Sequence, residues 1–144
     1  MGRIIAIDYG RKRTGIAVSD TLQIIANGLC TVTGEEASAF LKDYVAKEPV
    51  DLFVIGKPVQ MNNEPSENMQ HVKTFVALLR NAIPHIPIEY VDERFTSIMA
   101  HQAMIDGGLR KKRRRDKALT DEIAATIILQ GYLEGKRLSK IHNS

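Results

Sequence analysis

Short apolar runs alternate with longer amphipathic stretches along this chain. The first run, Arg3–Asp8, is separated from the second by a turn with a glycine near each side, Gly10 and Gly15, which suits a hairpin. The run at Asp51–Gly56 is continuously apolar up to its glycine, which predicts a strand buried on both faces, as in a parallel sheet. Pro87 indicates an edge position or a strand start. The predicted strands are Arg3–Asp8, Gly15–Ser19, Ile24–Val32, Asp51–Gly56 and Ile86–Val91.

Four stretches place apolar residues at helical spacing. Thr96 and Thr120 are candidate N-caps, and Gly107-Gly108 would end the third stretch. The predicted helices cover Glu35–Lys47, Ser66 to the residue before Pro84, Thr96–Asp106 and Thr120–Leu133. The order of elements predicts one α/β domain over residues 1–144, with a short flexible tail from about residue 137.

Composition changes this picture little. The chain has 144 residues, of which 44% are hydrophobic and 26% charged, as in an ordinary soluble domain. No apolar run approaches the ~20 residues that a membrane-spanning helix needs. The first residues do not resemble a signal peptide, and the single cysteine, Cys30, excludes an intramolecular disulfide. We therefore expect a cytoplasmic protein without a membrane partner.

Charge is unevenly distributed. Residues 101–144 carry ten Lys or Arg and five Asp or Glu, a balance of +5, against −2 for residues 1–100. Most of the excess lies in one basic run: Arg110, Lys111, Lys112, Arg113, Arg114, Arg115 and Lys117. Such a run favours contact with a polyanion such as nucleic acid, although a merely solvated loop is an equal alternative.

Three acids stand at predicted element boundaries. Asp8 ends the first strand, Glu93 follows the last one, and Asp121 begins the last helix. The working end of an open α/β sheet is at the carboxyl ends of its strands. Ala124 and Ala125 would let the last helix approach the sheet closely. Gathered carboxylates repel one another unless a divalent cation lies between them, so they predict a Mg²⁺ or Mn²⁺ site.

Each acid also has an ordinary interpretation. Asp121, with Glu122, could complement the helix dipole. Asp8 could be a strand-to-turn acid, and Glu93 could form a surface ion pair with Arg94. The shared location at one end of the sheet favours the metal site over three separate roles.

Four ordered motifs carry a family resemblance over nearly the whole chain. They are Ile5–Gly10 with Arg13, Gly15, Ser19 and Asp20; Val54–Pro58 with Met61 and Asn62; Asp92–Ser97; and Lys117 with Asp121 through Gln130. With them the chain resembles the YqgF family of ribonuclease-H-like proteins. Lys57 stands where the family more often has an apolar residue.

The resemblance implies a fold and an activity. The fold is ribonuclease-H-like, α/β, with a mixed five-stranded sheet whose first three strands are antiparallel, flanked by helices. Asp8, Glu93 and Asp121 would be catalytic carboxylates that bind Mg²⁺ or Mn²⁺. Family members are described as candidate nucleases that trim the 5′ end of precursor 16S ribosomal RNA in ribosome biogenesis, and as candidate Holliday junction resolvases acting on branched DNA. Asp92, Glu122 or Asp116 could supply a fourth acid.

Basic residues near the acids could bind phosphate. Arg13, Lys57 and Arg94 would reach phosphates beside the metal, or form ion pairs with the acids instead. The basic run would contact the nucleic-acid backbone.

Two other functions stay open. Asp8, Gly10 and Gly15 also match the phosphate-binding turn of actin-like and sugar kinases, but those proteins need two such domains. A non-catalytic nucleic-acid-binding factor for ribosome assembly would need the basic run and none of the acids. A resolvase would have to be a homodimer, whereas a trimming nuclease could be a monomer.

Overall fold

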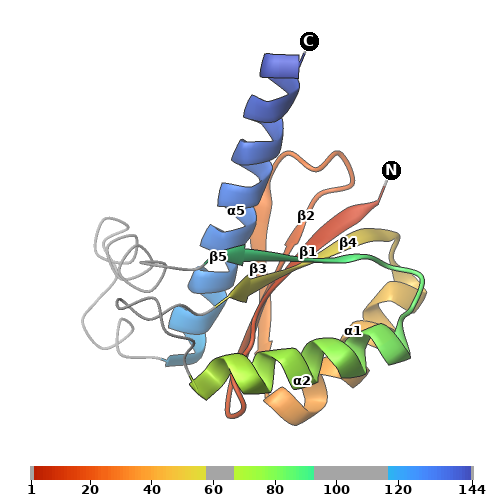
Figure 1. The fold of residues 1–144 in the computed structure, drawn as a ribbon, viewed down its shortest axis with the longest axis vertical. Coiled ribbons are helices and arrows are strands. Elements are labelled where there is room, and N and C mark those ends of the chain that lie inside the picture. The colour runs from red at the N-terminus through yellow and green to blue at the C-terminus, as the bar shows by residue number, and fades with distance from the viewer. Residues whose placement is uncertain (1, 58–66, 93–116, 144) are drawn as a thin grey trace.

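A sheet of five strands in the order β3-β2-β1-β4-β5 forms the centre of the molecule. The computed structural model describes residues 2–57, 67–92 and 117–143, and Figure 1 draws these parts as ribbons. β2 pairs antiparallel with both β1 and β3, whereas β4 is parallel to both β1 and β5. The strands are β1 (Arg3–Asp8), β2 (Thr14–Ser19), β3 (Ala26–Val32), β4 (Val50–Lys57) and β5 (Ile88–Asp92).

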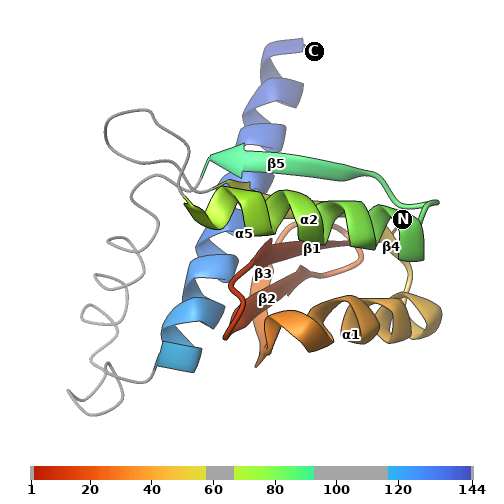
Figure 2. The same ribbon diagram turned by 60° about the horizontal axis from the view of Figure 1, so that its bottom comes forward.

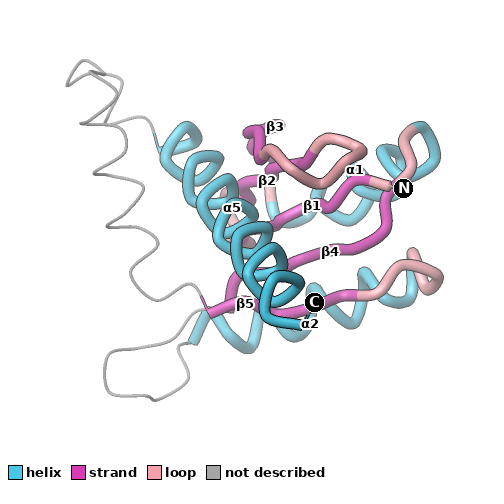
Figure 3. The backbone as a smooth tube through the Cα atoms, turned by 90° about the horizontal axis from the view of Figure 1, so that it is seen from above, coloured by secondary structure: helices cyan, strands magenta, loops and turns pink. Residues whose placement is uncertain are grey.

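Helices cover both faces of this sheet. α1 (Gly34–Lys47) and α2 (Glu67–Ala82) lie on one face, and α5 (Lys117–Asn143) lies on the other, as Figure 2 shows. Seen from above, α5 crosses the strands obliquely, from the β3 side toward the β5 side (Figure 3), and it contacts β1, β2, β3 and β4. The expected fold class, a mixed sheet with its first three strands antiparallel, is confirmed.

Alternation along the strands divides the core into two clusters. Ile5 and Ile7 of β1 belong to the cluster on the α1 and α2 side, whereas Ile4 and Ala6 belong to the cluster under α5. The two sets are a direct consequence of the period of two residues in a strand. β4 is buried on both faces from Leu52 to Gly56. The prediction from its continuous apolar run is therefore confirmed, and so is the edge position that Pro87 indicated for β5.

The last helix is longer than its sequence pattern predicted. We expected Thr120 to cap it and Leu133 to end it, but α5 begins at Lys117 and continues to Asn143. Both predicted boundaries were wrong. The apolar stripe shows only which part of the helix packs against the sheet, and the helix extends beyond that part at both ends. Beyond Leu133 the helix rises past β5 (Figure 1) and needs no apolar stripe to continue. The residues from about 137 are thus helical, and their flexibility stays a prediction.

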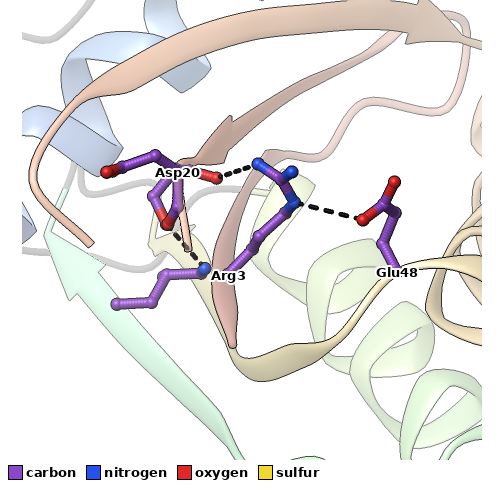
Figure 4. Close-up of polar contacts among 5 residues, drawn as sticks. Arg3, Asp20 and Glu48 are labelled. Atoms are coloured by element: carbon purple, nitrogen blue, oxygen red, sulfur yellow. Dashed lines mark hydrogen bonds and ion pairs between the residues drawn. The ribbon is translucent and has the colours of Figure 1, made fainter. Parts of the chain in front are cut away.

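Polar contacts tie the first strand to its neighbours at the end opposite Asp8. Arg3 donates from Nη1 to the Ser19 carbonyl at 3.1 Å, and its Nε lies 3.5 Å from Glu48 Oε2 (Figure 4). The Ile4 amide donates to Ser19 Oγ at 2.8 Å. The two hydrogen bonds satisfy polar groups where β1 enters the core, whereas Arg3 Nε is buried and has only the ion pair with Glu48.

The predicted helix over Thr96–Asp106 lies outside the described residues. None of the described helices is long and apolar enough to cross a membrane.

Candidate metal centre

Asp8 is the last residue of β1 and is half-buried. Because Ile4 and Ala6 face α5, alternation places Asp8 on the same face, two residues nearer the carboxyl end of the strand. The next residue, Tyr9, packs the other way: its ring stacks on Phe75 of α2, with centroids 4.5 Å apart. The end of β1 is therefore fixed on the side of the sheet that α2 covers.

Glycines flank Asp8 on both neighbouring strands. Gly15 of β2 is its direct partner in the sheet. On β4, Ile55 pairs with Ile7, so that Gly56 follows at the level of Asp8. Neither strand contributes a side chain beside the carboxylate at that level. The Asp8 side chain therefore has no side chain of a directly neighbouring strand residue beside it.

The turn after Asp8 is held by hydrogen bonds. Thr14 Oγ1 donates to the Gly10 carbonyl at 2.9 Å and accepts from the Gly10 amide at 3.3 Å. The amide of Gly34, at the start of α1, donates to the Arg11 carbonyl at 3.0 Å. Arg11, Lys12 and Arg13 are exposed on this turn. The turn therefore presents three basic residues next to Asp8, of which the sequence had singled out Arg13.

Asp121 lies on α5, four residues after its first residue, not at its start as we expected. Ala124 and Ala125 follow it by three and four positions; both are buried, and Ala125 belongs to the cluster between α5 and the sheet. The close approach predicted from these alanines is confirmed. Helical spacing puts position 121 on the same stripe, one turn nearer the helix start.

Glu93 directly follows Asp92, the last residue of β5, and lies outside the described residues together with Arg94. Lys57, exposed at the end of β4, pairs in the sheet with Asp92. The parallel strands β1, β4 and β5 thus end on the same side of the sheet, with Asp8, Lys57 and Asp92 as their last residues.

Of the remaining predicted site residues, some lie in the described part of the chain and others lie outside it. Lys117 is the first residue of α5, whereas residues 110–115 and the candidate fourth acid Asp116 lie outside the described part. Among the described side chains, no three His, Cys, Asp or Glu residues come together as a metal site. Asp8 is the one predicted metal-binding acid whose side chain lies in the described part of the chain, and carboxylate oxygens are the ligands that a hard cation such as Mg²⁺ prefers.

Two contacts of α5 were not predicted. Glu122 lies over Gly28 of β3, and Tyr132 donates a hydrogen bond to Glu89 of β5, which together with burial raises the pKa of Tyr132 to about 12. A glycine inside a strand pattern is a signal for a close approach, so Gly28 could have been singled out. Its partner could not, because that depends on how α5 crosses the sheet.

Comparisons with known proteins match this chain to a family model and to named relatives. Residues 2–135 match the family model RuvX, described as a Holliday junction resolvase. A protein of Parabacteroides distasonis, named "Putative pre-16S rRNA nuclease", is 64% identical over 137 residues, which cover 95% of this chain and 98% of that protein. One of Bacteroides thetaiotaomicron with the same name is also 64% identical over 137 residues, covering 95% and 99%.

Among solved structures, RuvC of Thermus thermophilus in complex with a Holliday junction substrate superposes with a TM-score of 0.57 at 14% identity, covering 95% of this chain and 96% of that one. A second Thermus thermophilus RuvC structure gives a TM-score of 0.58 at 15% identity, covering 94% and 96%. These likenesses show a shared ribonuclease-H-like fold.

Proposed function

Because the chain belongs to the RuvX (YqgF) family, we propose that it is a divalent-metal-dependent nuclease that hydrolyses phosphodiester bonds in nucleic acid. One observation carries the proposal: Asp8 ends β1 between two glycines, on the face that α5 covers. A carboxylate in that place fits a metal ligand better than it fits a packing role.

Asp8, Glu93 and Asp121 would hold Mg²⁺ or Mn²⁺. When bound, such ions supply an activated water and stabilise the leaving oxygen of the phosphodiester. The three carboxylates would orient the ion, and the buried strand β1 would keep the Asp8 carboxylate in place. Exposed Arg13 and Lys57 would pair with phosphate oxygens beside the cut bond and hold the strand in line. Arg94 would act with them.

The substrate we propose is the 5′ end of precursor 16S ribosomal RNA. The names of the proteins 64% identical to this chain support it. Acting on that precursor would place the protein in the cytoplasm, in contact with ribosomal particles. The basic residues 110–115 and Lys117 would bind the RNA backbone without reading its sequence.

A second substrate, branched DNA, is favoured by the description of the matching family as a Holliday junction resolvase. Symmetric cleavage of a junction needs two active sites related by a two-fold axis, and hence a homodimer. Sedimentation of the protein with and without a four-way junction tests for this requirement.

A cleavage assay on a panel of substrates tests the proposal. Precursor 16S RNA, its mature-length form and a four-way DNA junction are incubated with the protein and Mg²⁺ or Mn²⁺. We expect cleavage of the precursor, lowered at least ~100-fold in Asp8→Asn, since even residues that merely support metal ligands are worth ~10–100-fold. Asp43→Asn, an exposed acid on α1 paired with Lys47, is the matched control and should cleave like the wild type.

Three results would contradict the proposal. Equal cleavage by wild type and Asp8→Asn would remove Asp8 from the metal site. RNA binding without metal-dependent cleavage of any substrate, and unchanged in Asp8→Asn, would favour a non-catalytic assembly factor. ATP binding in calorimetry would point to the kinase-like turn instead.

A further inference from the structure

We propose that Glu122 is a positioning residue: its side chain lies over Gly28 of β3 and fixes the first turns of α5, and thereby Asp121, relative to Asp8. The proposal rests on the metal site proposed above. It also removes Glu122 from the candidates for a fourth metal-binding acid.

The contact between Glu122 and Gly28 is close. A Cβ atom added to Gly28 would lie 2.9 Å from Glu122 Cγ and 3.0 Å from Cδ, and it would meet Oε1 as well. Cβ atoms do not approach other atoms so closely, so a side chain at position 28 would displace the flexible end of the Glu122 side chain from its place over the strand. Burial and the nearby charge of Glu122 both raise the pKa of Cys30, two residues further along β3.

The sheet register shows why this glycine faces α5. Gly28 pairs with Ala17, which belongs to the cluster under α5. The register shifts between Ile16 and Ala17, since Ile16 pairs with Cys30, and Leu29 is the additional residue of the bulge. Leu29 and Cys30 both pack toward the α1 and α2 side. Because of the bulge, Gly28 faces α5 and lies directly beneath the Glu122 side chain.

The same register separates Glu122 from Asp8. Gly28 is in line with Ala17 and Ala6, whereas Asp8 is in line with Gly15 and Thr31. Two strands across and two residues along amount to roughly 12 Å, given spacings of ~4.8 Å and ~3.3 Å. Ligands of one Mg²⁺ lie only ~2.1 Å from it, so a carboxylate held over Gly28 does not share an ion with Asp8.

α5 is also held at the opposite edge of the sheet, by a contact with β5. Ten residues after Glu122, Tyr132 bonds to Glu89 on the edge strand β5. Between these two contacts, Ala125 and Leu129 are fully buried against the sheet. Glu122 therefore determines where the beginning of the helix lies, and Asp121 is its immediate neighbour.

Mn²⁺ affinity, measured by calorimetry on the purified full chain, tests the proposal. Gly28→Ala should weaken binding ~10-fold, the low end for residues that support metal ligands, because its methyl group displaces Glu122. Glu122→Ala should weaken it similarly. The double variant should recover most of the loss, because the new methyl group fills the space that Glu122 leaves. Asn27→Ala, at the exposed neighbouring position of β3, is the control.

Glu122→Gln distinguishes positioning from metal binding. The amide has nearly the same shape as the carboxylate, so a positioning residue predicts Mn²⁺ affinity within ~2-fold of the wild type, whereas a lost ligand costs far more. Thermal unfolding of each variant checks that the protein is folded at the temperature of the calorimetry. A loss in Glu122→Gln as large as that in Asp8→Asn, or unchanged affinity in Gly28→Ala, overturns the proposal alone. Wild-type binding that does not depend on Asp8 overturns the metal site and this proposal together.

Discussion

Single residues join α5 to the sheet, and Tyr132 offers the clearest test at this scale. Its hydroxyl donates to Glu89, and burial with that contact raises its pKa from 10.0 to about 12. A tyrosine with a raised folded-state pKa contributes stability that is fully present below pH 10. That contribution is lost as the pH rises through about 12, because the unfolded chain releases the proton first.

The test compares the wild type with Tyr132→Phe. We expect the wild type to lose stability more steeply between pH 10 and 12 than the variant does, in urea unfolding at several pH values. An absorbance titration of the phenolate should lack its highest transition in Tyr132→Phe. Identical alkaline titrations of the two proteins would show that Glu89 does not hold this proton.

The role that can be assigned to Asp8 depends on its neighbours in the sheet. An acid at the end of a strand is common, and its ordinary interpretation is a turn. Gly15 and Gly56 change that interpretation, because at the level of Asp8 neither adjacent strand has a side chain. The sequence contained these glycines, but it could not show that they flank Asp8 until the strand order was known.

At the scale of elements, the small side chains of α5 set its distance from the sheet. Ala125 is fully buried against the cluster that contains Ala6 and Ala17. Ala125→Leu should therefore cost ~1–3 kcal/mol through overpacking. At about 4 °C for each kcal/mol in a chain of this length, the melting temperature should fall measurably.

Gln130→Leu is the matched control for that variant, because it introduces the same side chain at an exposed position of the same helix. Its stability should stay within ~0.5 kcal/mol of the wild type. Mn²⁺ affinity should fall in Ala125→Leu and not in Gln130→Leu, since only the first moves the helix. Equal melting temperatures for the two variants would mean that α5 does not pack as closely as its alanines indicate.

The elements also show what a sequence pattern can and cannot predict. The continuous apolar run before Gly56 predicted a strand buried on both faces, because no other strand environment tolerates it. The end of α5 was not predicted, because the residues after Leu133 continue the helix although they do not extend its apolar stripe. The contact between Glu122 and Gly28 was missed because it joins residues 94 positions apart through a helix crossing that no local pattern encodes.

At the scale of the whole molecule, the basic residues and the proposed metal site come from different parts of the chain and would contact the same substrate. The turn that follows Asp8 presents Arg11, Lys12 and Arg13. The basic run of residues 110–115 lies in the chain between β5 and α5, two elements that lead to Glu93 and Asp121. Its position in the chain makes it a candidate backbone-binding segment for the same substrate.

Salt dependence measures that role directly. Replacing Lys112, Arg113, Arg114 and Arg115 with Gln removes four cations, each of which releases counterions when it binds a phosphate. The slope of log K against log salt concentration should then flatten by about 3.6 for duplex nucleic acid, at ~0.9 per contact. Replacing four cations elsewhere on the exposed surface (Lys42, Lys47, Lys73 and Arg80) is the control and should leave the slope nearly unchanged. An unchanged slope in the first variant would show that the run does not contact the backbone, and binding would then depend on Arg11, Lys12 and Arg13 beside the metal site.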